Sequence, residues 1–191
     1  MAGVVHLRSY DDRDRDDEET RKVIGATLEL LREVPYSDIT MRAIGERAGI
    51  SIGSLREHFW SKDAIVAEIY LGRLRALPLD VDVERDAKHR VMAQFSHLVM
   101  LLADEPGLAA ACSSALVGSD PSVRSVRERI HAEYHRRVRT MLRSGAWPEV
   151  TQTLEFGLVG ALIHASCGVD NFAQAADDLA CMVAAVLPDG C

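Results

Sequence analysis

Side chains that can bind anionic oxygens and nucleobase edges gather in one short stretch, residues 40–62. This stretch combines hydroxyl, guanidinium, imidazole and ammonium groups, on Thr40, Arg42, Ser51, Ser54, Arg56, His58 and Lys62. An arginine such as Arg56 can make two hydrogen bonds to a guanine edge, which discriminates against other bases by about 1–3 kcal/mol. Ile52 and Gly53 lie between the polar residues, and the glycine would let the backbone come close to a ligand. The stretch is therefore a candidate phosphate- and base-binding surface.

Two short helices and a tight turn are predicted to position these groups. Thr40 and Ser51 are good N-caps, because a hydroxyl can accept a free backbone N–H of the first helical turn. Gly49 separates the two helices, since a left-handed position after a helix suits glycine best. Apolar residues recur at helical spacing in residues 41–48 and again in residues 52–59. This arrangement is a helix-turn-helix, whose second helix can enter a DNA major groove.

A longer string of residues resembles the DNA-binding region of the TetR family of transcriptional regulators, over about residues 21–70. The string comprises Ile39-Thr40-Met41-Arg42, Ile44-Gly45, Ala48-Gly49-Ile50-Ser51, Gly53, Leu55, His58-Phe59, Ser61-Lys62-Asp63 and Ile65. The resemblance implies phosphate contacts at Thr40, His58 and Lys62. Arg56 departs from the family, which usually has a tyrosine phosphate contact at this position. Because arginine can hold a phosphate or reach a guanine edge, this departure concerns the operator contacts more than the fold.

Helical patterns and turn signals predict an all-α protein of nine helices without a strand. The expected helices are 18–34, 40–48, 51–59, 61–78, 86–103, 107–117, 121–143, 148–167 and 171–187. Residues 1–19 are predicted to form a disordered acidic tail, because their dense charge lacks apolar periodicity. The family resemblance implies a helix-turn-helix domain at 20–62 and a larger effector-binding and dimerisation domain at 63–191. The fourth helix would link the two domains.

Charge is distributed unevenly along the chain. The net charge is −7 overall, with −4 in residues 1–19, +2 in residues 20–75 and −5 in residues 76–191. The positive part coincides with the helix-turn-helix, although an excess of two charges would not indicate DNA binding by itself. DNA affinity depends more on the few side chains and helix N-termini that meet phosphates.

The two C-terminal helices are rich in small and apolar residues. Pro148 opens one helix, 148–167, and Asn171 caps the next, which ends at Leu187. So wide an apolar stripe would be exposed on a lone helical pair. In the TetR family these helices pair with their copies in a second subunit, so the resemblance implies a homodimer, with a purely intramolecular core as the alternative. Two recognition helices one DNA turn apart would read a pseudo-palindromic operator in double-stranded DNA.

The helices of the larger domain are predicted to enclose a small-molecule pocket. The residues expected to line it are mostly apolar with a few polar tips, as is usual for such sites. They are Met92, Phe95, Leu98, His131, Tyr134, Met141, Trp147, Phe156 and His164. The family resemblance implies that a small apolar effector bound there releases a repressor from its operator. For each residue, a role in plain core packing is the alternative.

No catalytic residue, metal site or cofactor is predicted. The chain has no glycine-rich phosphate loop, no GxSxG elbow and no nucleophile–base pair. His131 and His135 stand four residues apart and could share a metal ion, but the sequence places no third ligand. Four cysteines are expected to be reduced, with a redox sensor as the alternative for one of them. They are Cys112, Cys167, Cys181 and Cys191.

The leading interpretation is a ligand-responsive, homodimeric repressor. No apolar run reaches the roughly 18 residues that span a bilayer, and the N-terminus lacks the form of a signal peptide. We therefore expect a cytoplasmic protein with no membrane partner. Two alternatives are a regulator that activates or needs no ligand, and a helical carrier or enzyme with a purely structural hairpin. A carrier or enzyme would not require the string at 40–62.

Overall fold

The computed structural model describes residues 10–79, 84–143 and 147–187. These ranges contain nine α-helices, two short 3-10 helices and no strand, which confirms the predicted all-α class. The α-helices are α1 (Tyr10–Glu33), α2 (Met41–Ala48), α3 (Ile52–His58), α4 (Lys62–Ala76), α5 (Ala87–Met100), α6 (Pro106–Val117), α7 (Arg124–Leu142), α8 (Pro148–Ser166) and α9 (Phe172–Val186). The 3-10 helices are η1 (Tyr36–Asp38) and η2 (Pro121–Val123).

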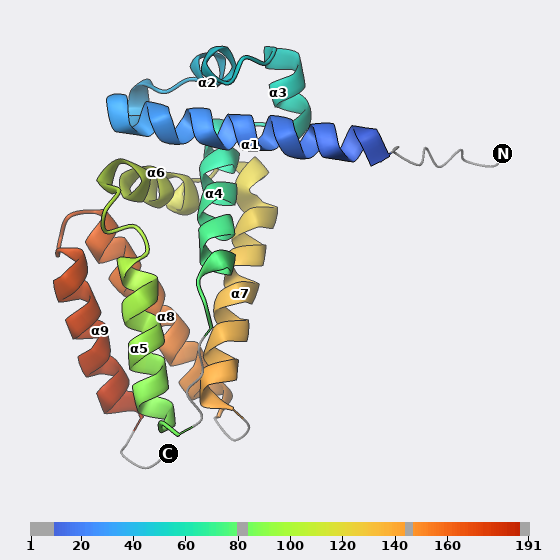
Figure 1. Ribbon diagram of the computed structural model, residues 1–191. Coiled ribbons are helices and arrows are strands. Elements are labelled where there is room, and N and C mark those ends of the chain that lie inside the picture. The colour runs from blue at the N-terminus through green and yellow to red at the C-terminus, as the bar shows by residue number, and fades with distance from the viewer. Residues whose placement is uncertain (1–9, 80–83, 144–146, 188–191) are drawn as a thin grey trace.

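The helices form a small upper layer and a larger body (Figure 1). α1 lies across one end of the molecule, with α2 and α3 on its outer side. α4 runs from beneath α1 into the larger body, where it packs beside α7. α5, α8 and α9 complete this body, and α6 lies crosswise between them and α1. α4 is therefore the helix that joins the helix-turn-helix to the rest of the protein.

α1 begins earlier than the sequence predicted. Residues 10–19 are helical, whereas the prediction placed them in a disordered tail at 1–19 and started the helix at about residue 18. Glu18 pairs with Lys22 one turn later at 2.7 Å. Acidic residues are also favourable near a helix N-terminus, where the helix dipole is positive. The prediction was wrong for residues 10–19 because it relied on apolar periodicity alone, and residues 1–9 lie outside the described ranges.

The predicted caps of the helix-turn-helix are confirmed. Thr40, Ser51 and Ser61 each accept a hydrogen bond from the backbone N–H three residues further on, at 3.0–3.1 Å. Asn171 caps α9 in the same way at 2.8 Å. Gly49 ends α2 with a φ of 68°, a left-handed conformation that glycine adopts without strain. These boundaries follow from local sequence, because each cap satisfies a backbone group that its helix leaves unpaired.

α4 is buried on several sides. It contacts α1, α6 and α7, and most of its side chains face other helices. The buried ones are Ala64, Ile65, Val66, Ala67, Ile69, Tyr70, Leu71 and Leu74. A helix that is apolar nearly all round belongs inside a protein. A displacement of α4 would therefore disturb both the helix-turn-helix and the larger body.

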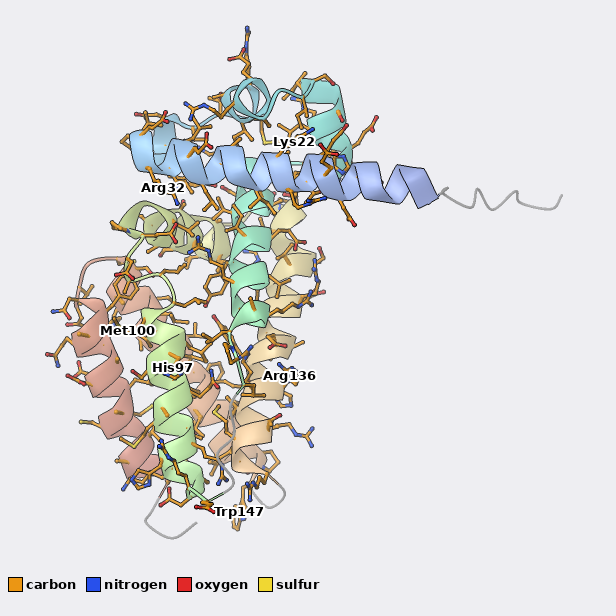
Figure 2. The ribbon with its side chains drawn as sticks, viewed as in Figure 1. Lys22, Arg32, His97, Met100, Arg136 and Trp147 are labelled. Carbon is orange, nitrogen blue, oxygen red and sulfur yellow. The ribbon has the colours of Figure 1, made fainter. Side chains whose placement is uncertain are left out.

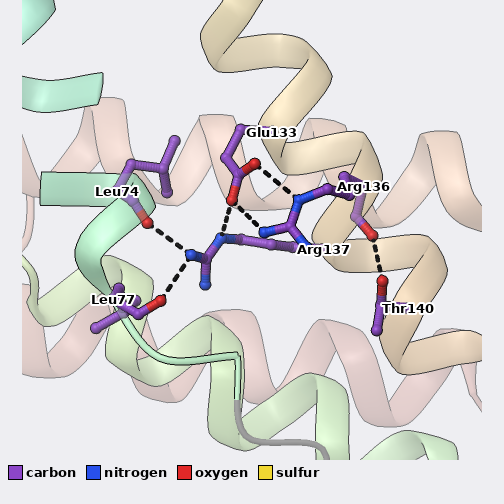
Figure 3. A network of polar contacts seen from close by, with 6 residues as sticks. All are labelled: Leu74, Leu77, Glu133, Arg136, Arg137 and Thr140. Atoms are coloured by element: carbon purple, nitrogen blue, oxygen red, sulfur yellow. Dashed lines mark hydrogen bonds and ion pairs between the residues drawn. The ribbon is translucent and has the colours of Figure 1, made fainter. Parts of the chain in front are cut away.

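A buried arginine fixes the end of α4 to α7 (Figure 3). Arg137 of α7 is 1% exposed, and its Nη2 donates to the carbonyl oxygens of Leu74 and Leu77 at 2.6 and 2.7 Å. Its Nε donates to the Glu133 carboxylate at 2.7 Å. Arg136 binds the same carboxylate, and this hydrogen bond lowers the pKa of Glu133. The guanidinium thus supplies the donors that the last carbonyl groups of α4 lack, and a cation there also favours the helix dipole.

Gly107 lies where the start of α6 meets α1. A Cβ atom at this position would lie 2.4 Å from the carbonyl oxygen of Leu31. Rotation of a side chain cannot relieve such a contact, because the opposing atom belongs to the backbone. Glycine is therefore required for the close approach of α6 to α1.

We expect Gly107→Ala to lower the free energy of unfolding by about 1–3 kcal/mol, the usual cost of overpacking. Gly72→Ala is the matched control, because Gly72 also lies in a helix and a Cβ there would meet no atom within 4 Å. Since alanine favours helix more than glycine does, the control should raise the free energy of unfolding by up to about 1 kcal/mol. Urea denaturation at one fixed protein concentration measures both. Equal stability of the two variants would contradict the close α1–α6 contact.

Candidate nucleic-acid interface

The outer face of α3 presents most of the predicted groove-facing residues to solvent. Leu55 and Phe59 are buried and anchor the helix in the core. Ser51, Ile52, Gly53 and Arg56 are exposed. Arg56 forms no hydrogen bond or ion pair with any described residue. Its guanidinium is therefore free to bind a ligand on this face.

The start of α2 offers a second exposed group of donors. Thr40 is exposed at the N-cap, beside first-turn N–H groups that have no partner within the helix. Such a helix N-terminus favours anions. Arg42 pairs with Glu46 at 2.8 Å, but both side chains are exposed. A surface pair of this kind contributes about 0–1 kcal/mol, so the arginine can exchange it for a phosphate at little cost.

Ser54 and His58 are partly buried against α1. Ser54 Oγ donates to the Glu19 carboxylate, and His58 Nε2 lies 3.4 Å from the same Glu19 oxygen. A phosphate at either residue would have to compete with this carboxylate. Sequence patterns did not predict this contact, because they assigned Glu19 to the disordered tail.

Arg47 fastens α2 to α1. Its guanidinium binds Glu33 at 2.6 Å and Glu29 at 3.3 Å. The hydrogen bond from Arg47 lowers the pKa of the Glu33 carboxyl. α2 is thereby held at a fixed place on α1, and α3 with it through the turn.

Lys62 binds within the protein rather than pointing freely into solvent. Its Nζ donates to the carbonyl oxygens of Tyr36 and Ile39 at 2.8 and 2.9 Å, and lies 3.4 Å from that of Ser37. The ammonium also lies 4.4 Å from the centre of the Tyr36 ring. These contacts hold η1 against the start of α4, so Lys62 has a structural role here. Its predicted phosphate contact stays a prediction.

Trp60 is an exposed aromatic residue that the sequence reading missed. It lies between the buried Phe59 and the N-cap Ser61, and is 80% exposed. Trp60 lies within the candidate stretch at 40–62, which was a signal, but it falls between two helices and belongs to neither apolar stripe. Its indole is available to a ligand bound beside α3.

A largely apolar cavity of about 320 Å³ lies among α4, α6, α7 and α8. Its lining includes Tyr70 from α4, Leu116 from α6, Ile130, His131 and Tyr134 from α7, and Leu162 from α8. The volume is within the usual range for small-molecule sites. We call this space the apolar cavity.

The nine predicted pocket residues have three different surroundings. Only His131 and Tyr134 line the apolar cavity. Four others are buried in the core or pack against it: Met92, Phe95, Leu98 and Met141. The remaining three are exposed: Trp147, Phe156 and His164. Trp147 lies at the end of the larger body opposite the helix-turn-helix (Figure 2). Helical spacing identified residues on the apolar side of each helix, but it could not show which of them line a cavity.

Two tyrosine hydroxyls meet at the edge of the apolar cavity. Tyr70 of α4 and Tyr134 of α7 are hydrogen-bonded to each other. Burial raises the pKa of both hydroxyls, so they remain protonated at neutral pH. Burial also raises the pKa of the nearby Cys112 thiol to about 12, which makes it a poor candidate for a reactive thiolate. The apolar cavity thus borders both α4 and α7 at the point where their tyrosine hydroxyls are hydrogen-bonded.

Glu155 of α8 joins the two histidines that the sequence placed on one helix. His135 Nδ1 lies 2.7 Å from Glu155 Oε1, and His131 Nε2 lies 3.5 Å from Oε2. Among the described residues, however, no group of three His, Cys, Asp or Glu side chains could hold a metal ion. The carboxylate contacts the histidines directly instead.

α8 and α9 present apolar and small residues to solvent. On α8 these are Phe156, Val159 and Ile163, spaced along one face, and Phe156 is 68% exposed. On α9, Ala173, Cys181 and Ala184 are exposed. On α8 these positions recur at helical spacing, so α8 has an uncovered face of low polarity, whereas the exposed face of α9 also carries Asp177.

None of the helices in the described ranges combines the length and apolar character that crossing a membrane requires.

Known proteins resemble this chain in sequence and in fold. The family model "Bacterial regulatory proteins, tetR family" matches residues 23–69. An uncharacterized HTH-type transcriptional regulator of Mycobacterium tuberculosis is 37% identical over 95% of this chain and 86% of its own length.

Two solved structures show the same fold at low identity. A TetR transcriptional regulator from Rhodococcus sp. RHA1 has a TM-score of 0.76 at 14% identity, over 93% of this chain and 100% of that one. The transcriptional regulator FadR from Bacillus subtilis, in complex with stearoyl-CoA, has a TM-score of 0.63 at 16% identity, over 88% of this chain and 99% of that one. The likeness extends well beyond the helix-turn-helix to the larger helical body.

We expect Lys62→Met to lower the free energy of unfolding by about 1–3 kcal/mol, because it removes a charged donor from partly buried carbonyl groups. Arg56→Met serves as the control, since Arg56 is exposed and makes no contact that stabilises the fold. The control should stay within about 0.5 kcal/mol of the parent protein. Urea titrations provide both values. If the two variants were equally stable, the structural role of Lys62 would be refuted.

Proposed function

Because this chain belongs to the TetR family of bacterial transcriptional regulators, we propose that it is a homodimeric repressor released from its operator by a small apolar molecule. The observation that carries the proposal is a cavity that directly borders α4, the helix leading to the helix-turn-helix.

The proposed DNA contacts divide by position into backbone and base contacts. Thr40 and Arg42 at the start of α2 bind phosphate, which fixes the register of the protein on DNA. On α3, Ser51, Ile52, Gly53 and Arg56 enter the major groove, and Arg56 reads a guanine edge. Ser54 and His58 join these contacts when phosphate displaces Glu19, and Lys62 acts mainly by holding η1 in place.

The proposed dimer forms through α8 and α9. An exposed Phe156 would be costly to leave in water, whereas a second copy could cover it. Val159 and Ile163 lie on the same helix face and also line the apolar cavity, so the proposed interface and the effector site are adjacent. Small residues on α9 allow close helix approach at such an interface. A two-fold dimer places two α3 helices against the two halves of a pseudo-palindrome.

The proposed effector binds in the apolar cavity. Tyr70 brings α4 to the wall of this cavity and is hydrogen-bonded to Tyr134 of α7. A ligand that fits only one position of Tyr70 would favour one position of α4. Through Ser61 at its other end, α4 would carry this change to α3. The complex of the similarly folded FadR with stearoyl-CoA supports binding of a small molecule by this fold.

Regulation then requires differential affinity for two states. In one state, the two α3 helices are spaced to fit successive major grooves. In the other state, the effector stabilises a position of α4 in which the two α3 helices no longer have that spacing. By thermodynamic linkage, operator DNA must weaken effector binding by the same factor.

We expect the purified protein to bind DNA from upstream of its own gene tightly and unrelated DNA weakly, as measured by fluorescence anisotropy. Affinity for both should fall steeply with salt, because binding releases counterions from phosphates. Arg56→Ala should lose about tenfold or more on the operator and much less on unrelated DNA. Arg75→Ala is the matched control, since Arg75 is exposed in the last turn of α4, away from α3.

Binding to the operator that Arg56→Ala leaves unchanged would refute base reading by Arg56. If neither upstream DNA nor any sequence selected from random DNA is bound specifically, the repressor proposal fails. A carrier or enzyme would then be the better interpretation.

We expect Phe156→Glu to convert the dimer to monomer at micromolar concentration, because the charge would be buried unpaired in the interface. Val34→Glu is the control, since Val34 is also an exposed apolar residue but lies directly after α1, away from α8 and α9. Sedimentation equilibrium measures the mass of each variant. A monomeric parent protein, or a dimeric Phe156→Glu, would exclude the α8–α9 interface.

A further inference from the structure

We infer that the effector is an amphipathic anion, with its apolar chain in the apolar cavity and a carboxylate head in a neighbouring polar cavity between α7 and α8. The inference deepens the proposed function, since it takes the apolar cavity to be the effector site. It assigns a role to a second cavity and to the side chains of His135, Arg139 and Glu155, which the proposed function leaves unused.

The second cavity measures about 460 Å³, and all but Pro148 of its lining residues are polar or charged. It is lined by His131, His135 and Arg139 of α7 and by Thr151, Gln152 and Glu155 of α8. α7 and α8 pack against each other in the larger body (Figure 1), and residues of both helices line this cavity. We call it the polar cavity.

The α7 wall of the polar cavity is a row of nitrogen-bearing side chains. His131, His135 and Arg139 follow one another at intervals of four residues, which places them on one face of the helix. Arg139 is exposed, and its guanidinium forms no hydrogen bond or ion pair with any described residue. A guanidinium can bind a carboxylate through two parallel hydrogen bonds.

The acidic side chain of this cavity is already engaged. Glu155 is mostly buried and contacts both His131 and His135. Its charge therefore faces the histidines, while the charge of Arg139 has no such partner. A head group with one negative charge would complement Arg139, whereas a cationic head would be repelled by it. A doubly charged head would meet stronger repulsion from Glu155.

His131 connects the two cavities. It is the one residue that lines both of them, and its side chain is 72% exposed, so the ring is not locked in the core. The bound molecule is therefore placed beside His131, with its chain on one side of this residue and its head group on the other. The 320 Å³ of the apolar cavity equals about ten water-sized volumes, which suits a chain of roughly ten atoms. Decanoate is therefore a suitable probe.

The test is calorimetric titration of the full-length protein with decanoate, decanol and decylammonium, which share one chain and differ in head charge. We expect decanoate to bind at least about tenfold more tightly than decanol, and decylammonium to bind more weakly still. Equal affinities for decanoate and decanol, stronger binding of decylammonium, or no binding of decanoate would each overturn the inference.

A pair of variants locates the head group. Arg139→Gln should weaken decanoate binding about tenfold and leave decanol unchanged. Arg124→Gln is the matched control, because Arg124 is an exposed arginine at the other end of the same helix and lines neither cavity. Decanoate affinity that is the same in both variants would refute the role of Arg139.

Operator binding, measured separately by anisotropy, distinguishes failure of the amphipathic-anion inference from failure of the repressor proposal. Specific operator binding without discrimination among the three probes would refute only the amphipathic anion. Discrimination among the probes without any specific operator binding would refute the repressor and retain the ligand site.

Discussion

The rest of the structure depends on how the C-terminal end of α4 is held. This end lies inside the larger body, where the last carbonyl groups of a helix lack N–H partners. Arg137 supplies the donors, and Glu133 provides the negative charge that makes a buried guanidinium tolerable. The other end of α4 starts at the cap Ser61, directly after α3. α4, which carries Tyr70, is therefore fixed at one end to α7 and leads at the other to the helix-turn-helix.

For contacts with DNA, the positions of individual charged side chains matter more than the net charge of −7. Arg47 and two glutamates attach α2 to α1, and Glu19 holds Ser54 and His58. Arg56 is left as a free cation on the outer face of α3. Carboxylates of α1 thus hold α2 and α3 in place, and a few hydrogen-bond donors on α2 and α3 remain exposed.

The sequence predicted the helix-turn-helix well because its determinants are local. Thr40, Ser51 and Gly49 act within three or four residues of their own positions, as caps and turn residues do. The start of α1 was missed because a charged helix lacks the apolar spacing on which the prediction relied. Trp60 was missed because it lies between two helical patterns and fits neither.

The sequence by itself determined the all-α class, most helix boundaries and the family resemblance, since these depend on caps, turns and apolar spacing. Only the tertiary structure decided that Tyr70 rather than Phe95 borders the apolar cavity, and that Lys62 binds carbonyl groups of η1. It also brought Glu155 to the two histidines of α7. These facts depend on how helices distant in sequence cross and pack, and helical spacing shows only which side of a helix is buried, not what lies opposite.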